Sequence, residues 1–466
     1  NLGVFPYKGP GTLPPISLES VNSHYAYNAI WWEELAKLDL STWSTPIIMG
    51  LVDQQSLTLP TSTLTLTIIS RKDKRRSGMR FLCRGADYDG NTSNYVETEQ
   101  IMGVGKDGKC TDLYSYVLAR GSIPILWQQS PSLHPVPKVK IEDSRTKNNR
   151  VFDRHVQNMR KAYNTIHFIN LIDKRGAQKD IGEKFTEVVV GSQRAHEEQM
   201  QTEEMQKQKI GYTWFDFHAE CPSSSLASLH KLVQGMGAEI EHQGNTHVSI
   251  GMDKAKLITR QTGIMRVNCM DCLDRTNVVQ TVLSRTVLTQ QLLSASILPR
   301  GDTPASPLPP SLDSMHTSLW ISNAHALSNL YAGTGAQKTS FTRDGKKNIV
   351  GKIADLGRSV RRYFVNNFYD TYRQNSVDLL LGHYPSSALA SISHNSPSST
   401  LFTGLLMAII PPVITSLYWK IIGEKINYWY IGFIGGISLF LSYQYIVSGA
   451  NKLWGERIQR DKGYRE

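Results

Sequence analysis

RVNCMDCLDRTN, residues 266–277, leaves five residues between Cys269 and Arg275. Five residues suffice for a backbone to curl around a phosphate group so that successive N–H groups point inward. The segment from Thr276 to Leu298 carries apolar residues at helical spacing, which predicts a helix directly after the loop. The positive end of that helix would point at the same place. The stretch therefore predicts a phosphate-binding loop that opens a helix.

The spacing Cys269, five residues, Arg275 and Thr276 is the pattern of cysteine-dependent phosphatases. The field of the loop favours the thiolate of Cys269, which we expect to attack phosphorus. Arg275 would hold two phosphoryl oxygens with its planar fork, and Thr276 would donate to the sulfur as it leaves. Asp271 and Asp274 are the acids closest in sequence, so either could protonate the leaving oxygen.

Cys269 and Cys272 also form a CxxC pair. No second CxxC and no His pair at zinc spacing follows, which argues against a structural zinc site. In a second interpretation the pair is redox-active, and Cys272 captures oxidised Cys269 as a disulfide. In a third, Cys272 packs beneath the loop as a small apolar residue. The sequence leaves the last two interpretations open.

Two uncharged runs near the C-terminus, residues 401–419 and 428–451, are each long enough to cross about 30 Å of hydrocarbon as a helix. A short turn joins them, so we expect a two-helix transmembrane hairpin over residues 401–451, with both ends on one side of the bilayer. The tail, residues 452–466, carries five basic residues. By the positive-inside rule this tail is cytosolic, and so is the rest of the chain.

The chain of 466 residues has a net charge of +11, which favours anionic partners such as membranes, nucleic acids or phosphorylated substrates. The chain has only five cysteines, and an odd number cannot all pair within one chain. A secreted disulfide framework is therefore not expected, and a reducing compartment is indicated. Residues 57–70 and 187–190 are strand-like, and residues 284–298 and 352–372 show helical spacing. Residues 298–315 are expected to form an exposed loop. An α+β (mixed α/β) fold follows.

RVNCMDCLDRTN closely resembles the signature of the Sac-domain phosphoinositide phosphatases, R-x-N-C-x-D-C-L-D-R-T-N. Further segments resemble that family in the same order, and the resemblance covers roughly residues 57–450. These segments are residues 84–90, 94–100, 120–124, 215–218 and 331–338. With its C-terminal hairpin, the chain is similar to the membrane-anchored endoplasmic reticulum and Golgi member of the family.

The resemblance implies a cysteine-phosphatase-like catalytic domain followed by the transmembrane hairpin. The expected organisation is, in order, a remnant of the N-terminal Sac subdomain with a disordered start at 1–70, a catalytic domain at 71–382, a spacer at 383–400, the hairpin at 401–451 and a cytosolic basic tail at 452–466. Two departures from the family stand out. Only the end of the N-terminal subdomain is recognisable, and Ser322 stands where some relatives carry an Asp.

The activity that the resemblance implies is hydrolysis of phosphatidylinositol monophosphates, chiefly the 4-phosphate and also the 3-phosphate, without a metal or other cofactor. It implies Cys269 as nucleophile, Arg275 as clamp, and Asp271 and Asp274 as required acids. The expected substrate-binding residues are Asn268, Met270, Cys272, Leu273, Thr276 and Lys338. Expected partners are the lipid substrate and the membrane in which the chain is integral, and nucleic acid is not expected. A membrane-anchored phosphoinositide-binding scaffold without turnover remains the alternative.

Overall fold

The structure is a computed structural model. It describes residues 21–106, 108–129, 138–199, 209–221, 227–251, 254–299, 303, 306–344, 349–383 and 435–438. The chain forms two compact units: a first unit of Asn1–Ser130 with Lys138–Arg362, and a second of Pro131–Pro137 with Tyr363–Glu466.

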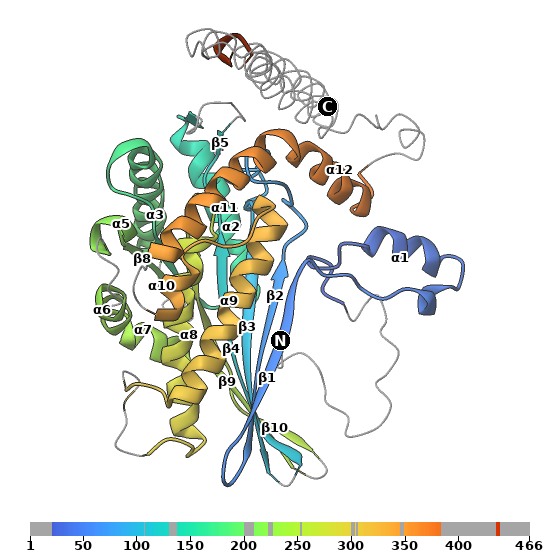
Figure 1. Cartoon of the computed structure of the whole chain (residues 1–466), viewed down its shortest axis with the longest axis vertical. Helices are drawn as coiled ribbons and strands as arrows, with labels where there is room; N and C mark the ends of the chain where they lie inside the picture. The colour runs from blue at the N-terminus through green and yellow to red at the C-terminus, as the bar shows by residue number, and fades with distance from the viewer. Residues whose placement is uncertain are drawn as a thin grey trace, which may run out of the picture. The chain divides into compact units, whose positions relative to one another are not determined.

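A twisted sheet forms the centre of the first unit (Figure 1). Its strands, within the described part of the chain, are β1 (Gly50–Thr58), β2 (Thr63–Lys72), β3 (Val96–Lys106), β4 (Lys109–Gly121), β7 (Thr165–Asn170), β8 (Ile210–Trp214), β9 (Thr246–Ile250), β10 (Ala255–Thr259) and β11 (Gly263–Asn268). The order is β1-β2-β3-β4-β11-β7-β8, and β9 pairs with β4 and β10. Strands β1 to β4 are antiparallel, whereas β4, β11, β7 and β8 run parallel. Strands β5 (Trp127–Gln129) and β6 (Val139–Ile141) form a separate pair.

Helices cover both faces of this sheet. One core joins the sheet to α2 (Arg145–Arg160) and α3 (Lys179–Gln199). The core on the other face joins it to α5 (Phe217–Glu220), α6 (Ala227–Gly235), α7 (Gly237–Gln243), α8 (Asp274–Ser294), α9 (Pro310–Ala332) and α10 (Thr339–Asp344). The remaining helical elements are α1 (Ala29–Ala36), η2 (Ser41–Trp43), η3 (Gly176–Gln178), α11 (Ile349–Phe368), which ends in the second unit, and α12 (Asp370–Leu380), which lies wholly in that unit. The predicted mixed α/β class is confirmed.

The strand expected over residues 57–70 is in fact the hairpin of β1 and β2. The ladder stops at Thr58 and resumes at Thr63, and the Leu59 N–H closes the turn on the Ser62 carbonyl at 2.8 Å. Pro60 lies in this turn because proline has no N–H to contribute to a ladder. Strand β2 continues to Lys72.

Two other local predictions were wrong. Residues 187–190 are helical, because Val188 and Val189 continue the buried α3 stripe that begins with Ile181 and Phe185. A window of one glutamate and three valines hides that helical period. The expected loop at 298–315 ends early, since α9 begins at Pro310, a favoured first helical residue.

The helices expected at 284–298 and 352–372 are present with different ends. Helix α8 ends at Ser294, and α11 ends at Phe368 before α12 begins at Asp370. Residues 1–20 of the segment expected at 1–70, the spacer after His383, the basic tail and the transmembrane hairpin lie outside the described residues, except for residues 435–438. Among the helices that the structure describes, none combines the length and apolarity needed to cross a bilayer.

Candidate active site

Strand β11 and helix α8 hold the loop that contains Cys269. Every residue of β11 is buried between β4 and β7, and five residues separate Asn268 from Asp274, the first residue of α8. In the part of the chain that the structure describes, the N–H groups of residues 270–275 donate to no protein acceptor. The loop therefore meets the predicted geometry of an anion site at the carboxyl end of a strand and the positive end of a helix.

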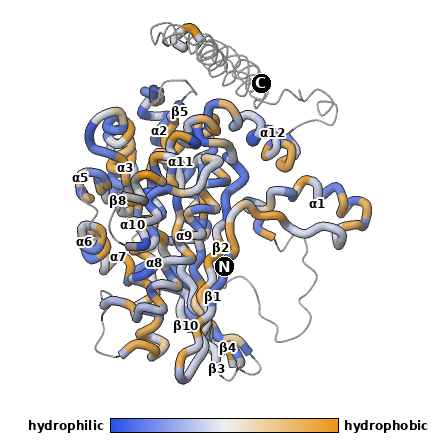
Figure 2. The backbone as a smooth tube through the Cα atoms, in the orientation of Figure 1, coloured by the Kyte–Doolittle hydropathy of each residue, from blue (hydrophilic) through white to orange (hydrophobic). Residues whose placement is uncertain are grey.

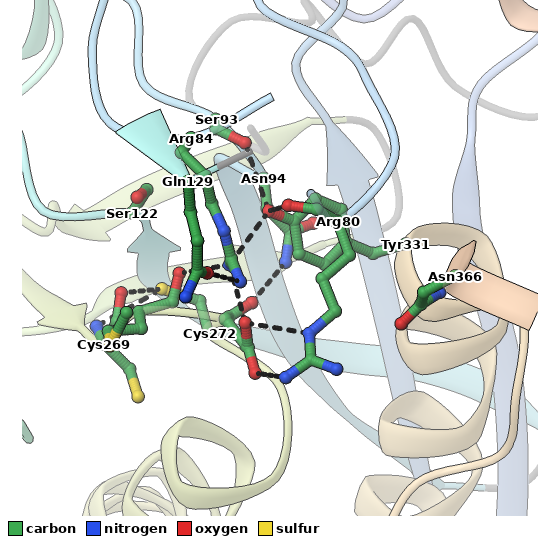
Figure 3. A network of polar contacts seen from close by, with 12 residues as sticks. Arg80, Arg84, Ser93, Asn94, Ser122, Gln129, Cys269, Cys272, Tyr331 and Asn366 are labelled. Atoms are coloured by element: carbon green, nitrogen blue, oxygen red, sulfur yellow. Dashed lines mark hydrogen bonds and ion pairs between the residues drawn. The ribbon is translucent and has the colours of Figure 1, made fainter. Parts of the chain in front are cut away.

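Cys269 and Cys272 are both buried free thiols. The Cys269 N–H donates to the Cys272 sulfur at 3.2 Å, and the Cys272 S–H donates to the Cys269 carbonyl at 3.0 Å. Cys272 has a φ of 52°, an uncommon value for a residue other than glycine. Figure 3 shows the Cys269 side chain pointing away from the Cys272 sulfur. These contacts favour the packing interpretation of Cys272 over the redox pair, and they give it a role in shaping the loop.

Alkylation tests this assignment. Burial, together with the nearby Cys269, raises the pKa of Cys272 to about 12. At pH 8 Cys272 is then almost entirely the thiol, which does not react. We expect iodoacetamide at pH 8 to leave Cys272 unmodified in the native chain and to modify it in the urea-denatured chain, as measured by peptide mass spectrometry. Equal rates in the two states would contradict the buried, hydrogen-bonded position.

Asp271 is held by two arginines. Its Oδ2 contacts Arg80 at 2.7 Å and its Oδ1 contacts Arg84 at 2.5 Å, and the Arg84 side chain is only 2% exposed (Figure 3). Asn94 donates to the Asp271 carbonyl at 2.9 Å, and Arg84 donates to the Met270 carbonyl at 3.0 Å. Burial favours the neutral acid, but the two guanidinium groups outweigh it and hold the pKa of Asp271 well below its usual range. An ionised Asp271 has no proton to donate at neutral pH, so it anchors the loop.

Removing this carboxylate should destabilise the fold. Asp271→Asn leaves the buried Arg84 without its counter-ion, and we expect the free energy of unfolding to fall by about 3 kcal/mol. Because the pKa of Asp271 is depressed in the folded chain, this stability is present above the usual Asp pKa of about 3.9 and is lost as the pH falls below it. The difference in the free energy of unfolding between wild type and variant should therefore be smaller in acid. Urea denaturation at pH 7 and pH 3 measures both effects.

The matched control for that experiment is Asp313→Asn. Asp313 pairs with Arg285 at 2.9 Å, but the two side chains are 38% and 25% exposed. An ion pair that is partly exposed contributes at most about 1 kcal/mol. If both variants lose the same small amount of stability, Asp271 does not anchor the loop through the buried Arg84.

Asp274 connects the start of α8 to two later segments. Its Oδ1 accepts from the Gln337 N–H at 2.6 Å, and its Oδ2 contacts Arg362 at 3.0 Å. Arg362, a buried residue of α11, also donates to the Thr334 hydroxyl and the Ser328 hydroxyl, each at 3.0 Å. The first residue of the helix behind the loop is thus fixed by α11 and by the segment that follows α9.

The Arg275 guanidinium donates hydrogen bonds to three protein acceptors. Its NH1 donates to the Leu171 carbonyl and to Asp173 Oδ1, each at 3.1 Å, and its NH2 donates to Gln178 Oε1 at 3.1 Å. The three acceptors follow β7, the neighbour of β11 in the sheet. Arg275, the predicted phosphate clamp, is therefore ion-paired with Asp173 in this structure. No role was predicted for Asp173 from the sequence.

Asp173 also joins Arg275 to Lys338. His218 Nδ1 lies 2.9 Å from Asp173 Oδ1, and His218 Nε2 lies 3.3 Å from the Lys338 ammonium. That ammonium sits over the Phe217 ring at 4.6 Å. Burial favours neutral Asp173, but the His218 hydrogen bond and the Arg275 charge lower its pKa. The structure thus brings Lys338, expected from the sequence to bind substrate, into the Arg275 cluster, together with a histidine that had no assigned role.

The other residues predicted to bind substrate lie in or beside the loop. Asn268 and Thr276 are fully buried, and the Asn268 amide and the Thr276 hydroxyl have no hydrogen-bond partner among the described residues. Met270 packs against the α2–α3 core, and Leu273 is buried with Tyr331. Met270 and Leu273 would therefore reach a ligand through their backbone N–H groups. Within the described part of the chain, no cluster of three or more His, Cys, Asp or Glu residues could hold a metal ion.

The sequence analysis missed Arg80 and gave Arg84 no role. Arg84 lies in one of the segments that resemble the family, and a charged residue in such a segment was the available signal. No comparable signal marked Arg80, Asp173 or Arg362, because their partners lie many residues away in the chain.

Comparisons with known proteins identify relatives of this chain. The family model described as the SacI homology domain matches residues 13–222. The chain is 35% identical to an uncharacterised protein of Schizosaccharomyces pombe, a match that covers 76% of this chain and 58% of that protein. It is 32% identical to the phosphatidylinositol-3-phosphatase SAC1 of Drosophila melanogaster, over 79% of this chain and 58% of that protein. It is 34% identical to the phosphatidylinositide phosphatase SAC2 of Danio rerio, over 70% of this chain and 27% of that protein.

The chain spans less than two thirds of the length of each of these relatives. The similarity extends over most of the present chain, and the loop from Cys269 to Arg275 has the spacing and surroundings of a phosphate site. The chain belongs to the Sac-domain phosphoinositide phosphatase family.

Proposed function

We propose that this chain hydrolyses the phosphomonoester of phosphatidylinositol monophosphates, chiefly the 4-phosphate and also the 3-phosphate, through a phosphocysteine intermediate. The observation that carries the proposal is the loop itself. Cys269 opens a run of N–H groups that donate to no described protein atom, and the run ends at the N-terminus of α8. Such a loop binds a phosphate dianion next to a thiolate. The 3-phosphate is included because one relative is named a phosphatidylinositol-3-phosphatase.

Two displacements make up the reaction. The Cys269 sulfur attacks phosphorus, the bond from phosphorus to the inositol oxygen breaks, and that oxygen takes a proton. Water then attacks the phosphocysteine, and the sulfur leaves as the thiolate with inorganic phosphate as product. The loop N–H groups and Arg275 stabilise the charge on the phosphoryl oxygens in both steps.

The proton for the inositol oxygen needs a donor other than Asp271, which is ionised. Asp274 is one candidate, although its carboxylate already accepts from Gln337 and Arg362. His218 is the other, because it is half exposed and close to Lys338.

The proposed place of action is the cytosolic face of the endoplasmic reticulum and Golgi membranes, with the chain anchored as an integral protein. Support comes from the two uncharged runs at 401–419 and 428–451 and from the basic tail after them. The five cysteines are compatible with a reducing compartment. The membrane and the phosphoinositide are the proposed partners.

Phosphate release separates this function from the alternative of a phosphoinositide-binding scaffold. The detergent-solubilised full chain is incubated with phosphatidylinositol 4-phosphate or 3-phosphate in the presence of EDTA. The proposal expects release from both lipids, faster from the 4-phosphate, with no loss on chelation. Binding of either lipid without any phosphate release would support the scaffold instead.

A further inference from the structure

Helix α11 exposes apolar side chains. Ile353, Leu356 and Val360 are 66%, 65% and 52% exposed, and their spacing of three and four residues places them on one side of the helix. In Figure 2 hydrophobic residues recur along α11 among hydrophilic ones. We call Ile353, Leu356 and Val360 the α11 stripe. Single exposed apolar residues are ordinary, but a stripe at helical spacing is not.

The opposite side of α11 is polar and faces the candidate site. Asp355 Oδ2 accepts from the Lys338 N–H at 3.1 Å, and Gln337 Nε2 donates to the Ser359 hydroxyl at 2.7 Å. Arg362, one turn further on, is 5% exposed and contacts Asp274 at 3.0 Å. A surface helix of a soluble domain normally buries its apolar side and exposes its polar side. Here the arrangement is inverted, because the polar side is occupied by the segment around Lys338 and by the start of α8.

The charge of α11 indicates what covers the stripe. Its sequence IVGKIADLGRSVRRYFVNNF contains four basic residues and one acidic residue, of which Arg362 faces the site and Arg358 pairs with Asp355 at 3.1 Å. Arg361 is exposed, and helical spacing places it at the margin of the α11 stripe. A helix with an apolar side flanked by cations lies in the interface of an anionic bilayer, where each cation near the surface contributes about 1 kcal/mol. A second copy of the chain would meet the same cations with like charge.

We propose that α11 is a membrane-docking helix that seats the α11 stripe at the acyl boundary of an anionic bilayer. Because Arg362 of the same helix holds Asp274, docking would fix the Cys269 loop at a set position relative to the lipid surface. The identity of the lipid on which the loop acts depends on the proposed function. The docking of α11 on a bilayer does not depend on it.

The kinetic test compares two forms of one substrate. The full chain is reconstituted into vesicles of phosphatidylcholine and phosphatidylserine that contain phosphatidylinositol 4-phosphate, and it is assayed separately on water-soluble dibutanoyl phosphatidylinositol 4-phosphate. The double variant Ile353→Ser/Leu356→Ser should lower kcat/KM on the vesicle lipid about tenfold, since two apolar side chains no longer enter the bilayer. Its kcat/KM on the soluble lipid should stay within about twofold of wild type, because these side chains do not touch the loop.

The matched control is Leu257→Ser/Ile258→Ser on β10, where the two side chains are 48% and 46% exposed. This control should leave both activities unchanged. An equal effect of the α11 variant on the two substrates would overturn docking, and so would a change in oligomeric state by light scattering, which would assign the stripe to a second copy.

A binding readout that needs no turnover keeps this test independent of the proposed function. Leu356→Trp in the same vesicles, with acyl chains brominated, should be quenched more than wild type, and Ile258→Trp should not. Quenching without phosphate release would retain docking and overturn the proposed function. Phosphate release without quenching at residue 356 would overturn docking and retain the function.

Discussion

Cys269→Ser is expected to lower phosphate release from phosphatidylinositol 4-phosphate by at least about a thousandfold. A serine hydroxyl supplies essentially no anion at neutral pH, so the first displacement has no nucleophile. The N–H groups of residues 270–275 are main-chain atoms and stay in place, so affinity for the lipid should remain close to wild type. Steady-state phosphate release and binding to vesicles that contain the lipid measure the two quantities.

Cys110→Ser is the control for that substitution. Cys110 is exposed on β4, and its sulfur donates to the Asp112 carbonyl at 3.6 Å. We expect its activity to stay within about twofold of wild type. Near-normal turnover by the Cys269 variant, or equal losses in the two variants, would remove Cys269 as nucleophile.

Arg275→Lys should reduce kcat/KM by about a hundredfold or more. The guanidinium of Arg275 now spans three acceptors that follow β7, and a lysine ammonium can neither span them nor hold two phosphoryl oxygens at once. To hold a phosphate, Arg275 must either keep its ion pair with Asp173 and bind the phosphate as well, or release Asp173. Asp173 also contacts His218. The variant keeps a positive charge beside Asp173, so it should lose turnover while remaining folded, as thermal denaturation measures.

Arg285→Lys is the conservative substitution to compare with it. Arg285 lies on the same helix, α8, and pairs with Asp313 at the protein surface. Its replacement should leave kcat/KM within about twofold of wild type. Equal catalysis by the two lysine variants would contradict the clamp.

The sequence was most informative where local physics decides the structure. The five-residue spacing from Cys269 to Arg275 and the apolar period after it predicted the loop and α8. The hairpin at Pro60 and the helical period around Val188 were misassigned, because short windows of β-branched residues fit a strand and a helix alike. Helix α11 was predicted, but its inverted orientation depends on Arg362 meeting Asp274, a contact between distant residues.

The roles of the two acids in the site also depend on contacts that the sequence does not reveal. Asp271 and Asp274 were equal candidates as proton donors from sequence, because both lie between Cys269 and Arg275. The difference comes from Arg80 and Arg84, which lie 191 and 187 residues before Asp271 in the chain. Tertiary ion pairs of this kind leave no periodic pattern in a sequence, and they decide whether a carboxyl group is free to give up a proton.

Trapping the covalent intermediate tests the phosphocysteine mechanism most directly. The full chain is mixed with phosphatidylinositol 4-phosphate, quenched in acid within milliseconds and digested, and the peptide that contains residues 266–277 is analysed by mass spectrometry. The mechanism predicts a phosphoryl group on the Cys269 sulfur that disappears on longer incubation and is absent from the Cys269→Ser variant. Steady phosphate release with no phosphoryl group on Cys269 at any quench time, or with one on another residue, would contradict it.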